Sequence, residues 1–259
     1  MAIALDQDSG RQTGANVASD TFSFASLPTV NDHIVVQVSG WHDSGFTMAD
    51  VTDNQGHNYL EDVEAVSAAG QCSASIYSVK VTASSGTFTV TLDPTGSSGN
   101  YIEWVTAEFS GLHATTHLHR TGTNNNSSQT SLAVTASAAN TEANCLVLAA
   151  ISVASGDTAC NISAPPTGYT QLAVNQNAAA TIGFEAAYKI VSATETSSVT
   201  WTFDVQDGAA GALATYVAAA GGAAVTGWGG LHHLPCGVGD PGVSVVPQTL
   251  HTIGQGISA

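Results

Sequence analysis

The chain has 259 residues, of which only 9% are charged, and twenty acidic residues against four basic ones give a formal net charge of −16. Four scattered cations cannot neutralise a row of phosphates, so the charge excludes nucleic acid as a partner and disfavours an anionic membrane. No apolar run approaches the ~20 residues that a membrane-spanning helix needs.

Residues 1–14 form a polar N-terminal extension in this interpretation. They contain neither a basic region nor an apolar stretch of about 7–15 residues, so we expect no signal peptide. Without such a peptide, the chain is expected to remain in the cytoplasm in which it is made until another machinery or cell lysis releases it.

Residues 15–112 read as one β-sandwich domain. Apolar and polar residues alternate in Phe22-Ser-Phe24 and across 87–92, and this period of two is typical of half-buried strands. The run Ile34-Val-Val36 indicates a more central strand. Clusters such as Asp53-Asn-Gln-Gly56 mark the turns between strands.

Residues 113–127 are predicted to be a polar linker, and residues 128–220 repeat the pattern of the first domain. Lys189 follows Lys80 by 109 positions and Asp204 follows Asp93 by 111. The same comparison matches Ile34-Val-Val36 with 146–148 and Val90 with Trp201. An internal duplication of a unit of typical domain length follows from this near-constant offset.

The predicted fold class is therefore all-β, with two tandem antiparallel sandwich or jelly-roll-like domains of about seven short strands each. The apolar positions of the alternating segments should form the cores: Phe22, Phe24, Ile34, Val36, Phe88, Val90 and Leu92 in the first copy, and Leu132, Val134, Leu146, Leu148, Val199, Trp201 and Phe203 in the second.

Residues 221–259 match neither copy and are rich in Gly and Pro, which sustain neither a helix nor a central strand. They nevertheless keep apolar side chains, which a disordered tail usually lacks. We interpret the segment as an extended C-terminal arm that mediates assembly; packing back onto the chain's own domains is the alternative. The assembly residues would be Trp228, Leu231, Leu234, Val243, Val245, Leu250 and Ile253.

Two groups of side chains raise the question of a metal site. His113, His117 and His119 lie close in sequence, but at the end of a domain exposed histidines are expected without a metal. A second group offers oxygen atoms to calcium, yet its spacing departs from the known calcium loop, and a tight turn explains part of it. Its members are Asp50, Asp53, Asn54, Asn58, Glu61 and Asp62. We predict no metal and no cofactor.

Catalytic patterns are weak throughout. The chain has no G-x-S-x-G elbow, and Glu103 and Glu108 have odd spacing, which places them on opposite faces of one strand and disfavours a glycosidase pair. Lys80 and Lys189 are interpreted as edge-strand charges that block unwanted pairing. Among the cysteines, a bridge between 145 and 160 is an alternative to reduced thiols. We predict no enzymatic activity.

The order of strand-like and turn-like segments resembles a tandem β-sandwich unit of tailed-phage virion proteins and some bacterial surface proteins. The segments that carry the resemblance are, in chain order, Phe-Ser-Phe, Leu-Pro-Thr-Val-Asn-Asp-His-Ile-Val-Val, Val-Thr-Asp-Asn-Gln-Gly-His-Asn-Tyr, Ile-Tyr-Ser-Val-Lys-Val and Glu-Phe-Ser-Gly-Leu112. The resemblance covers about 15–220 and leaves the C-terminal arm unplaced. It implies a structural role in capsid decoration or in a tail or fibre part.

The leading hypothesis is accordingly a non-enzymatic decoration or accessory protein on the virion exterior, whose partners are other virion proteins or copies of itself. An adhesin or fibre-associated module that binds glycan, in an extracellular setting, is the alternative. It would need exposed aromatic side chains such as Trp41. An accessory domain of a secreted hydrolase ranks third, because the sequence offers no catalytic site.

Overall fold

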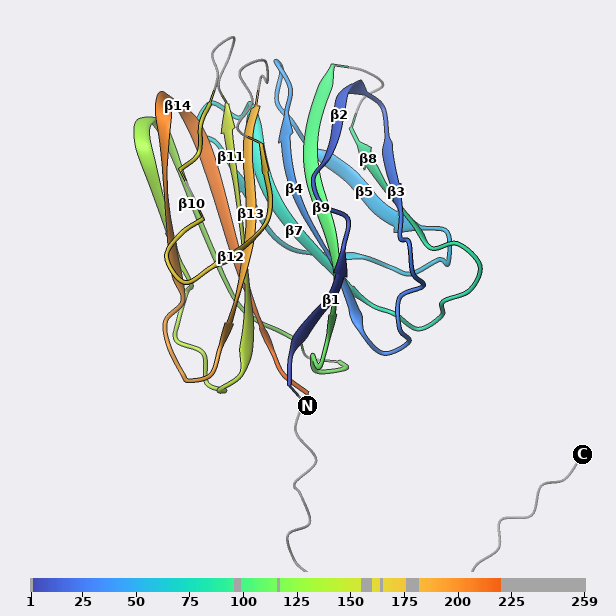
Figure 1. Cartoon of the computed structure of the whole chain (residues 1–259). Coiled ribbons are helices and arrows are strands. Elements are labelled where there is room, and N and C mark those ends of the chain that lie inside the picture. Colours follow the sequence, from blue (N-terminus) through green and yellow to red (C-terminus); the bar gives the residue numbers. More distant parts are fainter. Residues whose placement is uncertain are drawn as a thin grey trace, which may run out of the picture. The chain divides into compact units, whose positions relative to one another are not determined.

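The computed structural model describes residues 2–95, 99–115, 117–154, 160–163, 165–175 and 182–219, and these form an all-β structure of three antiparallel sheets (Figure 1). The strands of the first half are β1 (Ala4–Asp8), β2 (Gln12–Val17), β3 (Asp20–Ser23), β4 (His33–Trp41), β5 (Met48–Asp53), β6 (Leu60–Val66), β7 (Cys72–Lys80), β8 (Thr89–Pro94) and β9 (Asn100–Ser110). Those of the second half are β10 (Leu118–Thr135), β11 (Cys145–Ala154), β12 (Thr170–Asn175), β13 (Ile182–Val191) and β14 (Ser198–Val217).

The central sheet has the order β1-β9-β4-β7-β6, with β2 also paired to β9, and it is buried on both faces. Ile34, Val36 and Val38 on β4 point to one face, where they pack with Val90 and Leu92 of β8 in the small sheet β3-β8-β5. The alternate residue Val35 points to the other face. Because successive side chains of a strand point to opposite faces, a strand buried on both sides reads as a continuous apolar run.

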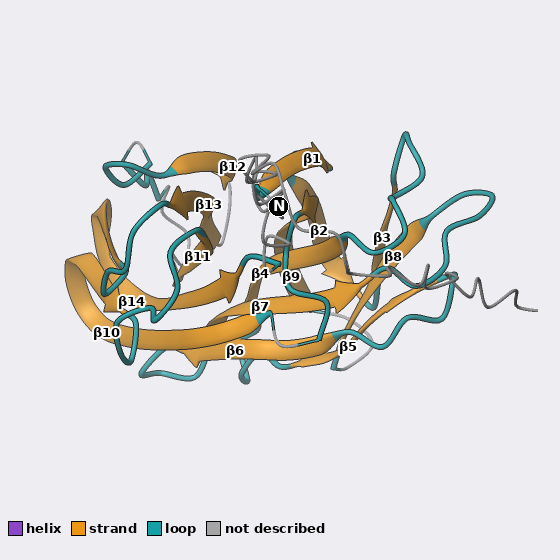
Figure 2. Ribbon diagram, turned by 90° about the horizontal axis from the view of Figure 1, so that it is seen from below, coloured by secondary structure: helices purple, strands orange, loops and turns teal. Residues whose placement is uncertain are grey.

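The other face of the central sheet packs against the third sheet, which has the order β10-β14-β11-β13-β12 (Figure 2). This shared core joins residues of β4, β6, β7 and β9 to residues of β11 and β14. Two buried polar contacts cross it: the Gln37 amide donates to the carbonyl of Ala149 at 2.8 Å, and the Ser39 hydroxyl donates to the hydroxyl of Ser152 at 2.8 Å. Residues 1–222 accordingly form one compact unit.

The strand-pairing scheme of the first half recurs in the second. Strand β4 lies between β7 and β9, and β11 lies between β13 and β14 in the same antiparallel sense. The predicted match of Val90 with Trp201 agrees with this register, because Val90 pairs with Phe22 and Trp201 pairs with Leu132, and the same sequence comparison aligns 21–24 with 131–134. The recurrence supports the interpretation of the sequence as a duplication.

The predicted match is wrong by one residue along two strands. Ile34 points into the core of the first sandwich, whereas Leu146 lies in the shared core and Val147 points into the second sandwich. The lysines differ in the same way: Val79, which precedes Lys80, faces the core of the first sandwich, whereas Tyr188, which precedes Lys189, packs against the shared core. A shift of one residue moves a side chain to the opposite face of the sheet, so the two lysines are not equivalent.

The predicted linker is also wrong, because most of it belongs to β10. This strand and β14 are longer than the short strands we expected, and each contributes to both layers of the second sandwich. The first part of β10, near 118–126, pairs with 209–216 of β14. After register shifts, 131–135 pairs with 198–202. Side-chain amides keep the polar segment in the sheet. Asn124 donates to the carbonyl of Ala133 at 2.7 Å, and Asn125 to that of Val66 at 2.9 Å.

The N-terminal extension 1–14 is not separate from the first sandwich, because β1 and β2 both pair with β9. Buried acidic side chains of β9 hold these polar strands in place. Glu103 accepts from Thr13 at 3.0 Å and pairs with Arg11 at 3.2 Å, while Glu108 accepts from Gln7 at 2.6 Å. Periodicity of apolar residues could not reveal strands that polar contacts retain.

The predicted core is confirmed at thirteen of its fourteen positions, and Phe22 is half-buried. One close contact in it depends on a glycine. A Cβ atom at Gly40 would lie 2.0 Å from the ring of Phe46, so only glycine lets the Phe46 ring cross β4 at this point.

The predicted C-terminal arm, residues 221–259, lies outside the described residues, and so do all seven predicted assembly residues. Within the described residues, no helix has the length and apolar character needed to cross a membrane.

Candidate functional site

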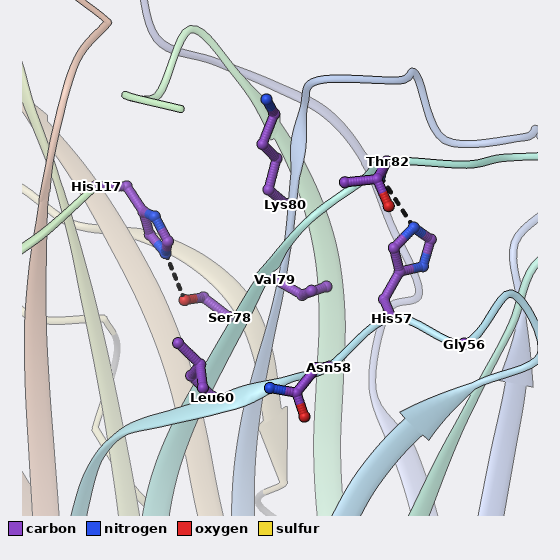
Figure 3. A pocket seen from close by; sticks show the side chains of 9 residues that line it. All are labelled: Gly56, His57, Asn58, Leu60, Ser78, Val79, Lys80, Thr82 and His117. Carbon is purple, nitrogen blue, oxygen red and sulfur yellow. Dashed lines mark hydrogen bonds between the residues drawn. The ribbon is translucent and has the colours of Figure 1, made fainter. Parts of the chain in front are cut away.

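A pocket of about 330 Å³ opens beside the end of β7 (Figure 3). Its lining comes from three places: the turn before β6, the end of β7 with the residues that follow, and the segment that leads into β10. The lining residues are Gly56, His57, Asn58, Leu60, Ser78, Val79, Lys80, Thr82 and His117. Both halves of the chain therefore contribute to one pocket.

His57 fixes one wall of the pocket. Its Nδ1 lies 2.8 Å from a carboxylate oxygen of Asp53, and its Nε2 accepts from the backbone N–H groups of Thr82 at 3.0 Å and Ala83 at 3.1 Å. Since Nε2 accepts, the proton lies on Nδ1 and the ring is neutral in this arrangement. This bonding holds the chain after β7 against the turn before β6.

Lys80 is the cation of the pocket. Within the described part of the chain its ammonium group has neither an ion pair nor a hydrogen bond, whereas the side chains of the other three basic residues are engaged. Arg11 pairs with Glu103, Lys189 lies 2.9 Å from Glu195, and Arg120 donates to backbone carbonyls. The nine lining residues include no Asp or Glu, although the chain carries twenty.

A histidine pair lies next to this pocket, within the body of the protein. His33 is fully buried and packs against His117 with ring centroids 4.5 Å apart, and His117 stacks on Tyr216. His117 is oriented by a 2.9 Å hydrogen bond to the hydroxyl of Ser78. Among the described residues, neither ring nitrogen of His33 has a hydrogen-bond partner. Burial, the neighbouring His117 and the charge of Lys80 lower the pKa of His33 to about 3.

The three histidines considered for a metal do not converge. His117 bonds Ser78, His119 lies 3.0 Å from the Thr141 hydroxyl, and Nδ1 of His113 accepts from the backbone of Thr115. Among the described residues, no three Cys, His, Asp or Glu side chains are grouped so that they could hold a metal ion.

The oxygen-bearing residues considered for calcium are likewise held apart. Asp53 accepts from the backbone N–H groups of Gln55 and His57, which is the bonding of a tight turn. The Asn54 side chain bonds the backbone of 87 and 89, while Glu61 and Asp62 accept from the hydroxyls of Tyr77 and Tyr216. Asp50 lies exposed on β5, and Asn58 lines the pocket.

Glu103 and Glu108 lie on opposite faces of β9, as expected, and each binds the N-terminal strands. Glu108 also accepts from the backbone of Thr29, and its proximity together with burial raises the pKa of Asp32 to about 6. Glu108 also lines a smaller pocket of about 210 Å³, together with Asp6 and Thr29.

The interpretation of Lys80 and Lys189 as edge-strand charges is wrong. Strand β7 pairs with both β4 and β6, and β13 pairs with both β11 and β12, so neither lysine lies on an edge strand. Lys80 lies instead where β7 ends beside the pocket.

Two further predictions concern cysteine and tryptophan. Cys145 is a buried thiol outside any disulfide, so the considered bridge between 145 and 160 is not formed. Trp41 is half-buried: its ring packs on Tyr101 at 5.5 Å between centroids and against the shared core. Little of its face is therefore free for a sugar.

Sequence reasoning missed the pocket, because its residues come from segments that are distant in the chain and carry no common motif. The lack of an acidic neighbour for Lys80 within the run 76–82 was the one available signal. No protein-family model, curated protein or solved structure matches the chain.

Proposed function

We propose that this protein is a non-enzymatic structural component of a virion, a capsid decoration or accessory part on the particle exterior that assembles through residues 221–259. The observation that carries the proposal is the engagement of its reactive side chains within the scaffold. Glu103 and Glu108 hold the N-terminal strands, Asp53 and His57 hold a turn, and Asp62 binds Tyr216.

The construction of the body is consistent with this role. Three sheets share two continuous interfaces, and the central sheet is covered on both faces, so the described strands form one packed unit. The low content of charged residues leaves a neutral-polar surface. Such a unit can present an attachment segment without changing its own shape.

Assembly would fall to the C-terminal segment. Its forty or so residues are too rich in Gly and Pro to enclose a core, yet they contain Trp228 and several aliphatic residues that need apolar surface from elsewhere. Each aliphatic side chain that becomes buried contributes about 1.5–3 kcal/mol. A few such residues would be sufficient for stable attachment.

Light scattering after gel filtration tests the proposal. The full chain should form an oligomer, and a chain that ends at residue 220 should be a monomer with the same thermal unfolding profile. Replacing Val243, Val245 and Leu250 by Ser in the full chain should have the same effect as the truncation. Equal masses for all three proteins would contradict assembly through the arm, and absence of the chain from purified particles by mass spectrometry would contradict a virion role.

A further inference from the structure

The end of β14 is held from two sides. Strand β11 lies along one side, where Cys145 pairs with Val217 and the carbonyl of Asn144 accepts from the backbone N–H of Ala218 at 3.2 Å. The segment between β9 and β10 lies along the other side. Residues 220–259 continue the chain from this point.

Four residues of that segment, which we call the strap, supply the second side. The strap consists of Gly111, Leu112, His113 and His117. The backbone N–H of Ala219 donates to the carbonyl of Gly111 at 2.7 Å. The N–H of His113 donates to the carbonyl of Val217 at 3.0 Å, and the N–H of Val217 donates to that of His117 at 2.8 Å. These are backbone bonds, so they last only while the strap stays in place.

The side chain of His117 anchors the strap to the first half of the chain. It shares a 2.9 Å hydrogen bond with the hydroxyl of Ser78 (Figure 3) and packs against the ring of His33. Ser78 and His33 belong to β7 and β4 of the central sheet. The histidine pair therefore includes the residue whose carbonyl holds Val217, so a movement of His117 acts on the end of β14.

The histidine pair lies where a positive charge is costly. Three of its ring nitrogens are buried and bond no described residue, namely both of His33 and Nδ1 of His117. Lys80 lies directly opposite His33 in the pairing of β4 with β7, so both side chains leave the same face of the sheet. A proton on either ring would place a second cation beside Lys80 in a buried setting. Burial is the largest cause of a lowered pKa at both rings, and neighbouring cationic groups add to it.

The acidic side chains of the neighbouring strand β9 do not offset such a charge. His33 pairs with Phe109, which packs in the shared core, and Glu108 therefore points to the opposite face of the central sheet. Asp32 interacts with Glu108 rather than with the histidine pair. Burial raises the pKa of Asp32 to about 6, so its carboxyl group is largely neutral in mild acid.

The remaining titratable groups lead to the same result. Asp62 on β6 accepts from the hydroxyl of Tyr216, on which His117 stacks, at 2.7 Å. Burial raises the pKa of Asp62 to about 6, so this carboxyl group also loses its charge in mild acid. Its bond with Tyr216 joins β6 to β14 without the strap. His113 belongs to the strap itself and adds a positive charge when it is protonated.

We propose that the histidine pair makes the strap sensitive to pH, so that it holds the end of β14 in neutral solution and releases it in mild acid. Protonation moves the ring of His117 away from His33 and Lys80 into water, and the carbonyl of His117 leaves Val217. The end of β14 then keeps its bonds with β11 and presents an open backbone edge on the other side. This device does not depend on what residues 221–259 bind.

The sign follows from the preference of the held state for neutral rings. The strap is fully held above the ordinary histidine pKa of 6.5 and loses its hold as the pH falls below that value. At pH 4.5, about two units lower, each histidine that becomes exposed and charged favours release by up to about a hundredfold.

Hydrogen exchange of backbone amides, followed by NMR on the isotope-labelled full chain at pH 7.5 and pH 4.5, tests the strap. Protection factors remove the intrinsic pH dependence of exchange. Between the two conditions they should fall by at least about tenfold at His113, Val217 and Ala219, whose N–H groups make or adjoin the strap bonds. The amides of Val36 in β4 and Leu148 in β11, at the centres of their sheets, should keep their protection.

Two substitutions remove the titration in different ways. H33F keeps a ring at the buried position, and H117Q keeps a side chain that can bond Ser78. Each should reduce the fall in protection, and the double variant should limit it to less than about twofold. H119Q is the matched control, because His119 bonds Thr141 outside the pair, and it should respond like the unaltered chain. Melting temperatures at pH 7.5 show whether each variant is folded.

Three results would overturn the proposal. The first is unchanged protection of the three strap amides in acid. The second is an equal loss of protection at Val36 and Leu148, which would identify general acid unfolding instead of a local release. The third is the same fall in the folded single and double variants as in the unaltered chain, which would assign the response to other groups.

Discussion

His33 should make folding stability depend on pH in a way that one substitution removes. The side chain is fully buried beside His117, close to Lys80, and neither ring nitrogen bonds any residue in the described part of the chain. Its pKa falls from 6.5 to about 3 because burial and these neighbours disfavour the charged form. A protonated imidazole at this place would be an unpaired charge in the body of the protein.

The sign follows from the direction of this shift. Because the folded state favours the neutral ring, the contribution of His33 to stability is fully present above pH 6.5 and is lost as the pH falls toward 3. The loss approaches about 1.4 kcal/mol per pH unit, so at pH 4.5 it should amount to about 2–3 kcal/mol. Substitution of His33 by Phe keeps a ring in place and removes the titration.

Other buried groups act in the opposite direction, and the comparison cancels them. Burial raises the pKa of Asp62 to about 6 and that of Glu185 to about 7, so their protonated forms favour the folded state and their contribution grows as the pH falls. Both groups are present in both proteins. The difference in stability between H33F and the unaltered chain therefore isolates the histidine.

Urea unfolding followed by tryptophan fluorescence at several values between pH 7.5 and 4.5 measures this difference. At pH 7.5 the two proteins should have similar stability, or H33F should be slightly more stable, since the substitution removes two buried polar atoms without partners. Toward pH 4.5 the advantage of H33F should grow to about 2–3 kcal/mol. Stability curves that stay parallel over this range would refute the reasoning.

Three further predictions concern packing and metal. W201A should lower the free energy of unfolding by about 3–5 kcal/mol, because it leaves a cavity at a residue that is 1% exposed, and W201F should be closer to the unaltered chain. A melting temperature of W201A within one degree of that of the unaltered chain would contradict a core position. G40A should lower the free energy of unfolding by about 1–3 kcal/mol, because its Cβ would overlap the Phe46 ring, and the additional change F46L should restore part of this loss. Effects of the two substitutions that simply add would contradict this contact. Treatment with a chelator should leave the melting temperature unchanged; a drop of several degrees, restored by calcium or zinc, would contradict the prediction of no structural metal.

The fold class and the core could be predicted because burial leaves a period of two in the sequence. Alternation at Phe88, Val90 and Leu92 identified a strand with one buried face, and the structure buries all three. Where both faces of a strand are apolar, this alternation is lost and the sequence does not determine which face each residue points to. In Ile34-Val-Val36 and in 146–148 every residue is buried, so the sequence pattern fits either face and the match slipped by one residue.

Strands retained by polar contacts escaped prediction for a different reason. Asn124 and Asn125 in β10 look like linker residues, and only the structure shows the carbonyls that receive their amides. The candidate pocket could not be predicted from the sequence for a similar reason. Lys80 and His117 are 37 positions apart, and only the pairing of the sheets brings the segments that carry them together.

The central sheet has a consequence for how such a chain could arise. Val35, Ile76 and Phe109 lie in the core that the two halves share, so a protein made of the first half alone would expose them to water. An ancestor with a single repeat would have needed a second copy to cover that face. Joining both copies in one gene makes the encounter intramolecular, so that it no longer depends on the concentration of the protein. On this view the tandem arrangement preserves an old homodimer contact within a single polypeptide, and the sequences of its two sides were then free to diverge.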